Sequence, residues 1–139
     1  MRYMMLIAVL STLLMAGFVK VGETVEERSS GLVWQDDHAV EEKELLYDEA
    51  KVYCESLSLA GSSDWRLPTL YELQSIVDLT RYDPALQRGF HFGLSKNYWS
   101  ITPYADDETR AWAVDFKSGS TEHSRHSYDY YVRCVRDMK

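Results

Sequence analysis

Apolar residues recur at helical spacing between residues 40 and 59. The members of this stripe lie three or four positions apart, and they are Leu46, Ala50, Tyr53, Cys54 and Leu57. This spacing places side chains on one face of a helix, so we expect an amphipathic helix over residues 40–59. Its opposite face should be wet, because that face carries Glu44, Asp48, Lys51 and Glu55.

A second, shorter helix is expected directly after Pro68. Thr69 and Glu72 have the spacing of a capping box, in which a hydroxyl and a carboxylate accept hydrogen bonds from the first backbone amides of a helix. We expect this helix to end near Leu79, and its apolar face is formed by Leu70, Leu73, Ile76 and Val77.

Short β-prone runs occupy much of the remaining chain. Residues 24–25 and 32–34 flank a turn of serines and glycine, which predicts a β-hairpin. Further strands are expected at residues 98–102, at residues 111–116, whose apolar positions alternate, and at residues 130–135.

The runs between these elements are polar or rich in turn residues. Residues 80–97, 103–110 and 121–129 are therefore expected to be loops. The order is a hairpin, two helices and several short strands, with no alternation of strand and helix. It predicts an α+β fold in which two helices pack on short, mostly antiparallel strands joined by long loops.

The first 19 residues differ from the rest. A short basic start is followed by a nearly unbroken apolar run from Met4 to Val19. We interpret residues 1–19 as a signal peptide cleaved near Ala16 and Gly17, or as an uncleaved N-terminal membrane anchor. A buried helix of the fold is the remaining alternative. The first two interpretations predict export to the periplasm or cell surface, with residues 20–139 as one domain.

The chain has two cysteines, Cys54 and Cys134. An even count in a short exported chain is typical of a disulfide, which here would tie the first helix to the last strand. Two free, buried thiols are the alternative.

The formal net charge is -7, and the acidic residues are concentrated between residues 23 and 49. Nucleic-acid binding requires clustered lysine and arginine, so this composition disfavours a nucleic-acid partner. It also disfavours a simple binder of anionic polymers.

Three groups of residues resemble one known family. The N-terminal group is Gly31-Leu32-Val33-Trp34-Gln35 with Ala50, Tyr53, Cys54 and Leu57. The central group is Gly61, Trp65-Arg66-Leu67-Pro68-Thr69 and Glu72-Leu73, and the C-terminal group is Tyr98-Trp99-Ser100, Trp112-Ala113-Val114 and Tyr131-Val132-Arg133-Cys134-Val135-Arg136. Over residues 22–137 the chain resembles the Lcl C-terminal domain family, named for the C-terminal domain of a bacterial collagen-like adhesin.

This resemblance implies a C-type-lectin-like fold and a Cys54–Cys134 bridge. The sequence has neither the Glu-Pro-Asn nor the Trp-Asn-Asp tripeptide of calcium-dependent sugar-binding lectins, so a calcium-and-sugar site is not carried over. The adhesin that names the family binds sulfated polysaccharide and has a collagen-like stalk. The present sequence contains no Gly-x-y repeat and is acidic, so that ligand is not carried over either.

Catalytic and metal-binding patterns are weak. His123 and His126 are three residues apart and could share a metal, but two ligands do not make a site, and a solvated loop is the simpler interpretation. Carboxylates occur at Asp36-Asp37 and Asp106-Asp107-Glu108, yet sequence neighbours rarely converge on one point. No nucleophile or phosphate-loop motif occurs. We therefore expect no enzymatic activity, no cofactor and no native metal.

Several aromatic and charged residues are interpreted as structural. Arg66 lies where the chain enters the second helix, and its guanidinium is expected to hold loop carbonyls or a carboxylate rather than a ligand. Trp34, Trp65, Trp99 and Trp112 lie in predicted core elements and are expected to pack rather than form a binding platform. The proposed structural set around the second helix is Trp65, Arg66, Pro68, Thr69 and Glu72.

The candidate binding surface lies on the polar segments near the C-terminus. It comprises Asp106, Asp107, Arg110, His123, Arg125, His126 and Tyr128. Rigid scaffolds present functional groups on such loops, although plain solvated turns would have the same composition. The sequence predicts an exported binding or adhesion module for a glycan or an envelope or surface protein. A structural accessory domain of an envelope assembly is the alternative, and an enzyme is a third.

Overall fold

The computed structural model describes residues 17–139. The segment interpreted as a signal or anchor therefore lies outside the described residues, except for its last positions. Two of those positions, Phe18 and Val19, belong to the first strand, β1 (Phe18–Val21). Within residues 17–139 no helix has the length and apolar character needed to cross a bilayer.

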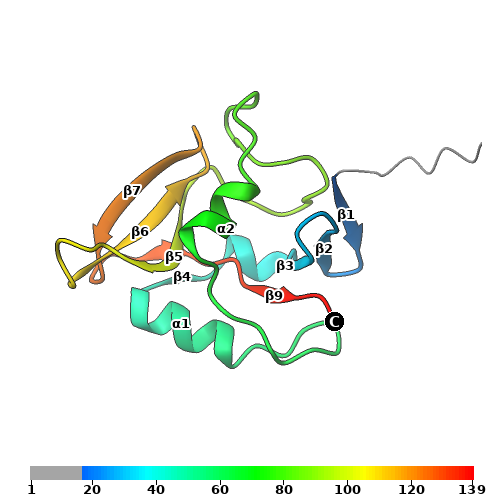
Figure 1. The fold of residues 1–139 in the computed structure, drawn as a ribbon, viewed down its shortest axis with the longest axis horizontal. Helices are drawn as coiled ribbons and strands as arrows, with labels where there is room; N and C mark the ends of the chain where they lie inside the picture. Colours follow the sequence, from blue (N-terminus) through cyan, green and yellow to red (C-terminus); the bar gives the residue numbers. More distant parts are fainter. Residues whose placement is uncertain (1–16) are drawn as a thin grey trace, which may run out of the picture.

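The two ends of the described chain share one sheet (Figure 1). Its order is β1-β2-β3-β9, formed by β1, β2 (Thr24–Glu27), β3 (Leu32–Gln35) and β9 (Val135–Asp137). Neighbouring strands are antiparallel. The β2–β3 pair confirms the expected hairpin, and Gly31 in its turn has φ 73°, a left-handed conformation that glycine adopts without steric cost.

A second sheet of five strands has the order β4-β8-β5-β6-β7. The strands are β4 (Glu44–Leu45), β5 (Asn97–Pro103), β6 (Arg110–Asp115), β7 (Ser120–Arg125) and β8 (Tyr130–Tyr131). The β5–β8 pair is parallel and the other pairs are antiparallel. The expected strands at residues 98–102 and 111–116 are confirmed as β5 and β6.

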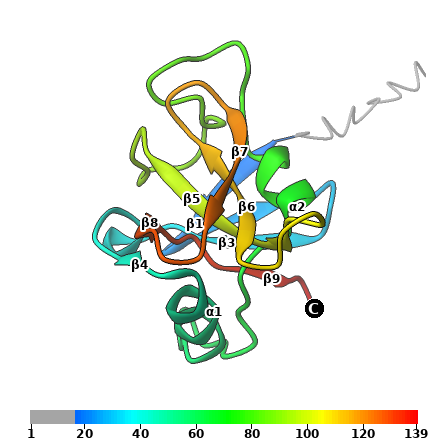
Figure 2. The ribbon, with the colours of Figure 1, turned by 90° about the vertical axis from the view of Figure 1, so that its left-hand side faces the viewer.

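The helices α1 (Tyr47–Glu55) and α2 (Leu70–Ser75) cover different sides of this second sheet (Figure 2). The core accordingly has two clusters. Strand β6 contributes Ala111 and Ala113 to the cluster under α1, and Val114 to the cluster under α2, where Phe116 joins it. Because successive side chains of a strand point to opposite faces, both faces of β6 are buried. The two helices and two sheets confirm the α+β class.

The helix expected over residues 40–59 is shorter than the sequence indicated. Residues 38–41 form a 3-10 turn, Glu44 and Leu45 pair with β8 as strand β4, and α1 begins only at Tyr47. The backbone amide of Leu46 donates to Glu49 Oε1, 3.0 Å away, and closes the start of α1. Pairing with a strand some 85 residues later has overridden local helix propensity, which is a weak preference.

The second helix has the expected capping box but also ends early. Thr69 Oγ1 accepts from the amide of Glu72, and Glu72 Oε1 accepts from the amide of Thr69. The helix ends at Ser75, not near Leu79. The chain turns there to bond with residues 85–87: the amide of Gln87 donates to Ile76 O and that of Asp78 to Ala85 O.

Two expectations near the C-terminus are wrong. Residues 120–125 are not a loop but form β7, an edge strand that pairs with β6 at six positions. An edge strand is held by backbone hydrogen bonds and needs few apolar side chains. The polar sequence of β7 therefore gave no strand signal. The single closing strand expected at residues 130–135 is divided into β8 and β9, because residues 132–134 carry the chain from one sheet to the other.

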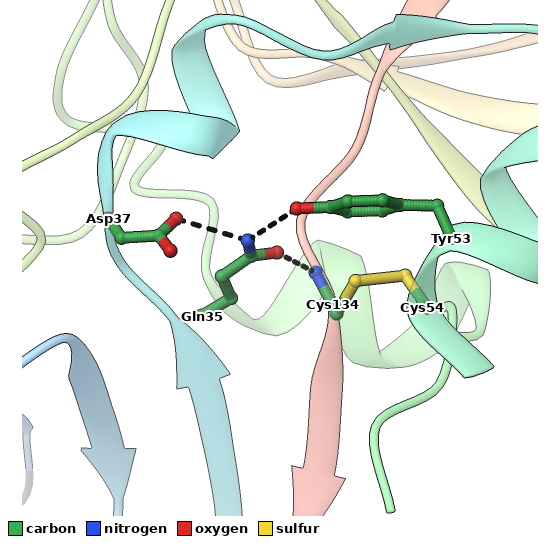
Figure 3. Close-up of a disulfide and its surroundings, with 5 residues drawn as sticks. All are labelled: Gln35, Asp37, Tyr53, Cys54 and Cys134. Carbon is green, nitrogen blue, oxygen red and sulfur yellow. Dashed lines mark hydrogen bonds between the residues drawn. A yellow bond between two sulfur atoms is a disulfide. The ribbon is translucent and has the colours of Figure 1, made fainter. Parts of the chain in front are cut away.

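The disulfide between Cys54 and Cys134 is present, with a Cα–Cα distance of 5.5 Å. It joins α1 to the residue preceding β9, as Figure 3 shows. Gln35 organises the surroundings of this bridge: its Oε1 accepts from the amide of Cys134, and its Nε2 donates to Asp37 Oδ1 and to the Tyr53 hydroxyl, each at 3.0 Å.

Candidate binding face

Strands β6 and β7 place three of the seven candidate residues on one face of the second sheet, and a fourth, Asp107, lies beside Arg110. Arg110 lies directly opposite Arg125, and Trp112 lies directly opposite His123. Residues two apart on a strand share a face, so Arg110, Trp112, His123 and Arg125 project to the same side. Because Val114 also projects there, this is the side of the sheet that α2 covers.

Three rings form a cluster on this face, which we call the aromatic cluster: Tyr104, Trp112 and His123. The Tyr104 and His123 rings are stacked, with centroids 3.9 Å apart and planes 3° apart. The Trp112 ring meets both edge-on, at 5.5 Å from Tyr104 and 5.4 Å from His123. All three residues remain partly exposed. Aromatic pairs in these geometries are favourable beyond their burial, so the cluster is a fixed surface.

Charged groups lie directly beside the aromatic cluster. Arg110 Nη1 is 3.4 Å from His123 Nδ1, and because a guanidinium has no acceptor, Nδ1 must be the accepting nitrogen. Arg110 Nε lies 3.5 Å from Asp107 Oδ2. The Thr109 hydroxyl and amide both donate to Asp107 Oδ1 and hold the pKa of this carboxyl below its usual value. The face therefore offers guanidinium donors and an ionised carboxylate next to aromatic rings.

The other three candidate residues do not join this constellation. The His126 ring stacks on Tyr47 of α1 at 4.1 Å, and Tyr128 is aligned with Tyr130 at 6.1 Å. Both contacts are on the opposite side of the sheet from the aromatic cluster. Asp106 is exposed in the loop after β5. The two polar segments nevertheless lie side by side, since the His126 amide donates to Thr109 O at 2.9 Å.

The two histidines are thus directed to different faces. His123 lies against Tyr104, whereas His126 lies against Tyr47. Among residues 17–139, no group of three or more His, Cys, Asp or Glu side chains is placed to hold a metal ion.

Sequence reasoning missed two members of the aromatic cluster. Trp112 was assigned to the core from the alternation of residues 111–116, but it is partly exposed, whereas Trp34, Trp65 and Trp99 are buried. The signal for Tyr104 was present: it is a lone aromatic residue in an otherwise polar loop.

Arg66 holds a carboxylate. Its Nη1 and Nη2 donate to the two carboxylate oxygens of Glu72 at 2.6 and 2.7 Å, and Nη2 also donates to Asp137 at 3.1 Å. The contacts link the entry of α2 to β9. The bidentate geometry is the strong form of this ion pair.

A buried ionic network connects the first sheet to the long loop before β5 and was not expected from the sequence. Asp36 is fully buried and accepts from Lys20, from Arg133 and from the backbone amides of His91 and Phe92. Burial alone would raise the pKa of Asp36, but these hydrogen bonds and the charge of Arg133 hold the pKa below its usual value. The network fixes the long loop before β5 against β3.

The fold and this face define a small α+β, disulfide-linked domain with an aromatic and charged surface on one sheet. The chain belongs to the Lcl C-terminal domain family, whose sequence model matches residues 23–136. A search of the curated proteins found no match to the chain.

Proposed function

We propose that this chain is an exported, non-enzymatic binding module with a C-type-lectin-like fold, and that it recognises a polar glycan through the β6–β7 face. The observation that carries the proposal is the stacked Tyr104–His123 pair with Trp112, set beside Arg110 and Asp107. Membership of a family named for the domain of an adhesin supports a binding role.

The chemistry of this face suits a sugar. A pyranose has an apolar face of C–H groups, which packs against aromatic rings, and a rim of hydroxyl groups, which both donate and accept hydrogen bonds. Arg110 and Arg125 supply donors, and the ionised Asp107 supplies an acceptor. Arg110 and Arg125 are directly opposed like charges, an arrangement that costs stability, and the carboxylate of Asp107 beside Arg110 offsets part of this repulsion.

Two carboxyl groups with a lowered pKa are engaged inside the fold, and their positions support a non-enzymatic role. Asp36 and Glu72 are engaged by arginine and by backbone amides inside the fold. A general acid or base must reach the reacting group of a substrate. Engaged in this way, neither carboxylate is free to do so.

The C-type-lectin-like assignment and export are part of the same proposal. The fold assignment is supported by three features: the two ends of the described chain lie in one sheet, a bridge joins α1 to the segment before β9, and a long irregular segment lies between α2 and β5. A disulfide is typical of an oxidising compartment, which favours the periplasm or the cell surface.

The test is a glycan array probed with the oxidised domain, followed by calorimetric titration of any sugar that binds. Alanine at Arg110, His123 or Arg125 should each weaken binding by about tenfold, the loss of one good polar contact. Arg88→Ala is the matched control, because Arg88 is an exposed arginine in the segment before β5.

If the three substitutions leave affinity unchanged while substitutions on the exposed face of α1 abolish it, the β6–β7 assignment is wrong. Tyr128→Ala gives a further distinction. Tyr128 lies away from the aromatic cluster, so its removal should not affect a sugar held there.

A structural role in an envelope assembly remains a second candidate. One specific observation favours it: an apolar groove lies along α1, on the side of the second sheet away from the aromatic cluster.

A further inference from the structure

An open groove of about 680 Å³ runs along α1. Leu45, Val52, Tyr53 and Leu57 form its apolar surface. Its charged lining residues, which we call its rim, are Lys43, Asp48 and Glu49. We call it the α1 groove. Its volume is within the range of ligand-binding clefts.

Val52 is the clearest sign that this surface is unusual. Val52 is 61% exposed within α1 and lines the groove together with the partly buried Tyr53 and Leu57. A single exposed valine is ordinary, but an apolar strip continuous with half-buried neighbours marks an interaction surface.

The floor of the groove is rigid. The Tyr53 hydroxyl accepts from Gln35 Nε2, and Gln35 in turn accepts from the amide of Cys134 (Figure 3). The adjacent residue, Cys54, is held by the disulfide. A partner would therefore bind a preformed surface, with little cost for ordering it.

The charge around the groove selects the kind of partner. Residues 41–55 contain six acidic side chains and two lysines. One of these lysines, Lys51, lies 3.1 Å from Asp48 and offsets part of its charge, so six acidic side chains less two lysines leave four net negative charges over residues 41–55. An excess of negative charge repels anionic polymers and anionic membranes and attracts cationic segments.

We propose that the α1 groove is a docking site for a basic, amphipathic segment of another protein. Apolar side chains of the segment would pack on Val52 and Leu57, and its lysine or arginine side chains would pair with Asp48 and Glu49. Helix α1 has nine residues, a length of roughly 14 Å, which matches two to three turns of a bound helix. This is the helix-in-groove mode of recognition. The proposal is independent of glycan binding on the β6–β7 face.

The probe is a synthetic amphipathic helix of 14 residues, with leucine on one face and lysine on the other. The control peptide has glutamate in place of every lysine. Calorimetry should give a Kd on the order of tens of micromolar for the lysine peptide and binding at least about tenfold weaker for the glutamate peptide. Amide chemical-shift changes should be confined to residues 43–58.

Two variants separate the apolar and electrostatic contributions. Val52→Ser removes exposed apolar surface without adding charge, and Asp48→Asn with Glu49→Gln removes the negative charges of the rim while keeping a residue suited to the helix cap. Each should weaken binding of the lysine peptide about five- to tenfold. Tyr71→Ser is the matched control, because Tyr71 is 84% exposed on α2. Urea denaturation of each variant checks the fold.

Several results would overturn the proposal. Equal binding of the two peptides would remove the charge argument, and an equal effect of Tyr71→Ser would show adsorption rather than docking. Shift changes near Trp112 and His123 would place the peptide on the other face. A dimer in sedimentation that Val52→Ser dissociates would assign the groove to a second copy of the chain. Competition of the peptide by micromolar dodecanoate would assign it to a small apolar ligand.

Discussion

At the scale of single residues, Arg133 stabilises the region where the first sheet meets the long loop before β5. Arg133 is almost fully buried and donates to Asp36 Oδ1, to Gln35 O and to Phe92 O, and its guanidinium lies over the Phe90 ring. A buried charge needs such a complete set of partners. Loss of either Arg133 or Asp36 alone should therefore cost more stability than the intact pair contributes, because the remaining charge stays buried without its partner.

Arg133→Met should lower the free energy of unfolding by about 3–5 kcal/mol, because it leaves Asp36 charged, buried and short of a partner. Urea denaturation at neutral pH measures the change. The matched control is Arg28→Met, since the Arg28–Glu26 pair is exposed and should contribute less than about 1 kcal/mol. Similar losses for the two variants would contradict this account of the network.

Acid should destabilise the protein by protonating carboxyl groups that are paired within the fold. Burial would raise the pKa of Glu72, but hydrogen bonds from Arg66 and Thr69 and the charge of Arg66 lower it, and the pKa of Asp36 is lowered similarly. A carboxyl with a lower pKa in the folded state stabilises the fold above its unfolded pKa, about 4. That stabilisation is lost as the pH falls through the folded-state pKa.

We therefore expect the free energy of unfolding to fall as the pH is lowered below about 4. Glu72→Gln should be less stable than the wild type at pH 7 and should lose less stability between pH 7 and pH 3. Urea denaturation across this range tests the claim. An identical pH slope for the variant would show that Glu72 does not contribute.

At the scale of elements, β1 brings Phe18 and Val19 into the first sheet. All four of its residues pair with β2, the Phe18 ring lies 5.4 Å from Phe90, and Lys20 donates to the buried Asp36. The first sheet therefore includes Phe18 and Val19, which the apolar pattern assigns to the N-terminal signal or anchor.

Phe18→Ala should cost about 1–2 kcal/mol, less than a fully buried phenylalanine because Phe18 is only partly buried. Val21→Ala, at the exposed end of the same strand, should cost less than about 0.5 kcal/mol. Thermal or urea unfolding measures both. Equal small effects would mean that β1 is not needed by the domain.

The same strand constrains export. If a signal is removed, the cut should fall before Phe18 so that β1 stays whole. Mass analysis of the protein from its native host should find a mature chain starting at Gly17 or Phe18, or a membrane-held form that retains its first residues. A full-length cytosolic form, or a chain starting beyond Val21, would argue against this expectation.

At the scale of the molecule, the disulfide closes a loop with a sequence separation of 80 and joins α1 to the first sheet. In the chain-entropy account, such a loop removes roughly 4–5 kcal/mol of unfolded-state entropy. Replacing both Cys54 and Cys134 by serine should lower the free energy of unfolding by about 2–5 kcal/mol. Urea denaturation of the variant, with non-reducing mass spectrometry of the wild type, provides the test. Free thiols in the native protein would refute the bridge.

The molecule as a whole presents two different surfaces on opposite sides of the second sheet. The β6–β7 face combines aromatic rings with arginine and aspartate, whereas the α1 groove is apolar with an acidic rim. The core explains why these surfaces are separate. Strand β6 has a buried cluster on each of its faces, so α1 and α2 pack on opposite sides of the second sheet. Different partners could therefore bind without competing.

Local signals in the sequence determined the hairpin at β2–β3, the capping box of α2, the strands β5 and β6, and the cysteine pair. Each of these depends on neighbouring residues or, for the cysteines, on a count. Three of the seven candidate residues also meet on one face, with Asp107 beside them, because β6 and the following polar segment are adjacent in the chain.

Only the tertiary structure decided the start of α1, the strand character of β7 and the network around Asp36. In each case the deciding partner is remote or is backbone: Glu44 and Leu45 pair with β8, β7 is held by the amides and carbonyls of β6, and Asp36 meets Arg133 from the last part of the chain. The pattern of side chains does not predict such pairings, because residues of any sequence can form backbone hydrogen bonds. For the same reason the tertiary structure separated His126 and Tyr128 from the face that sequence proximity had assigned to them.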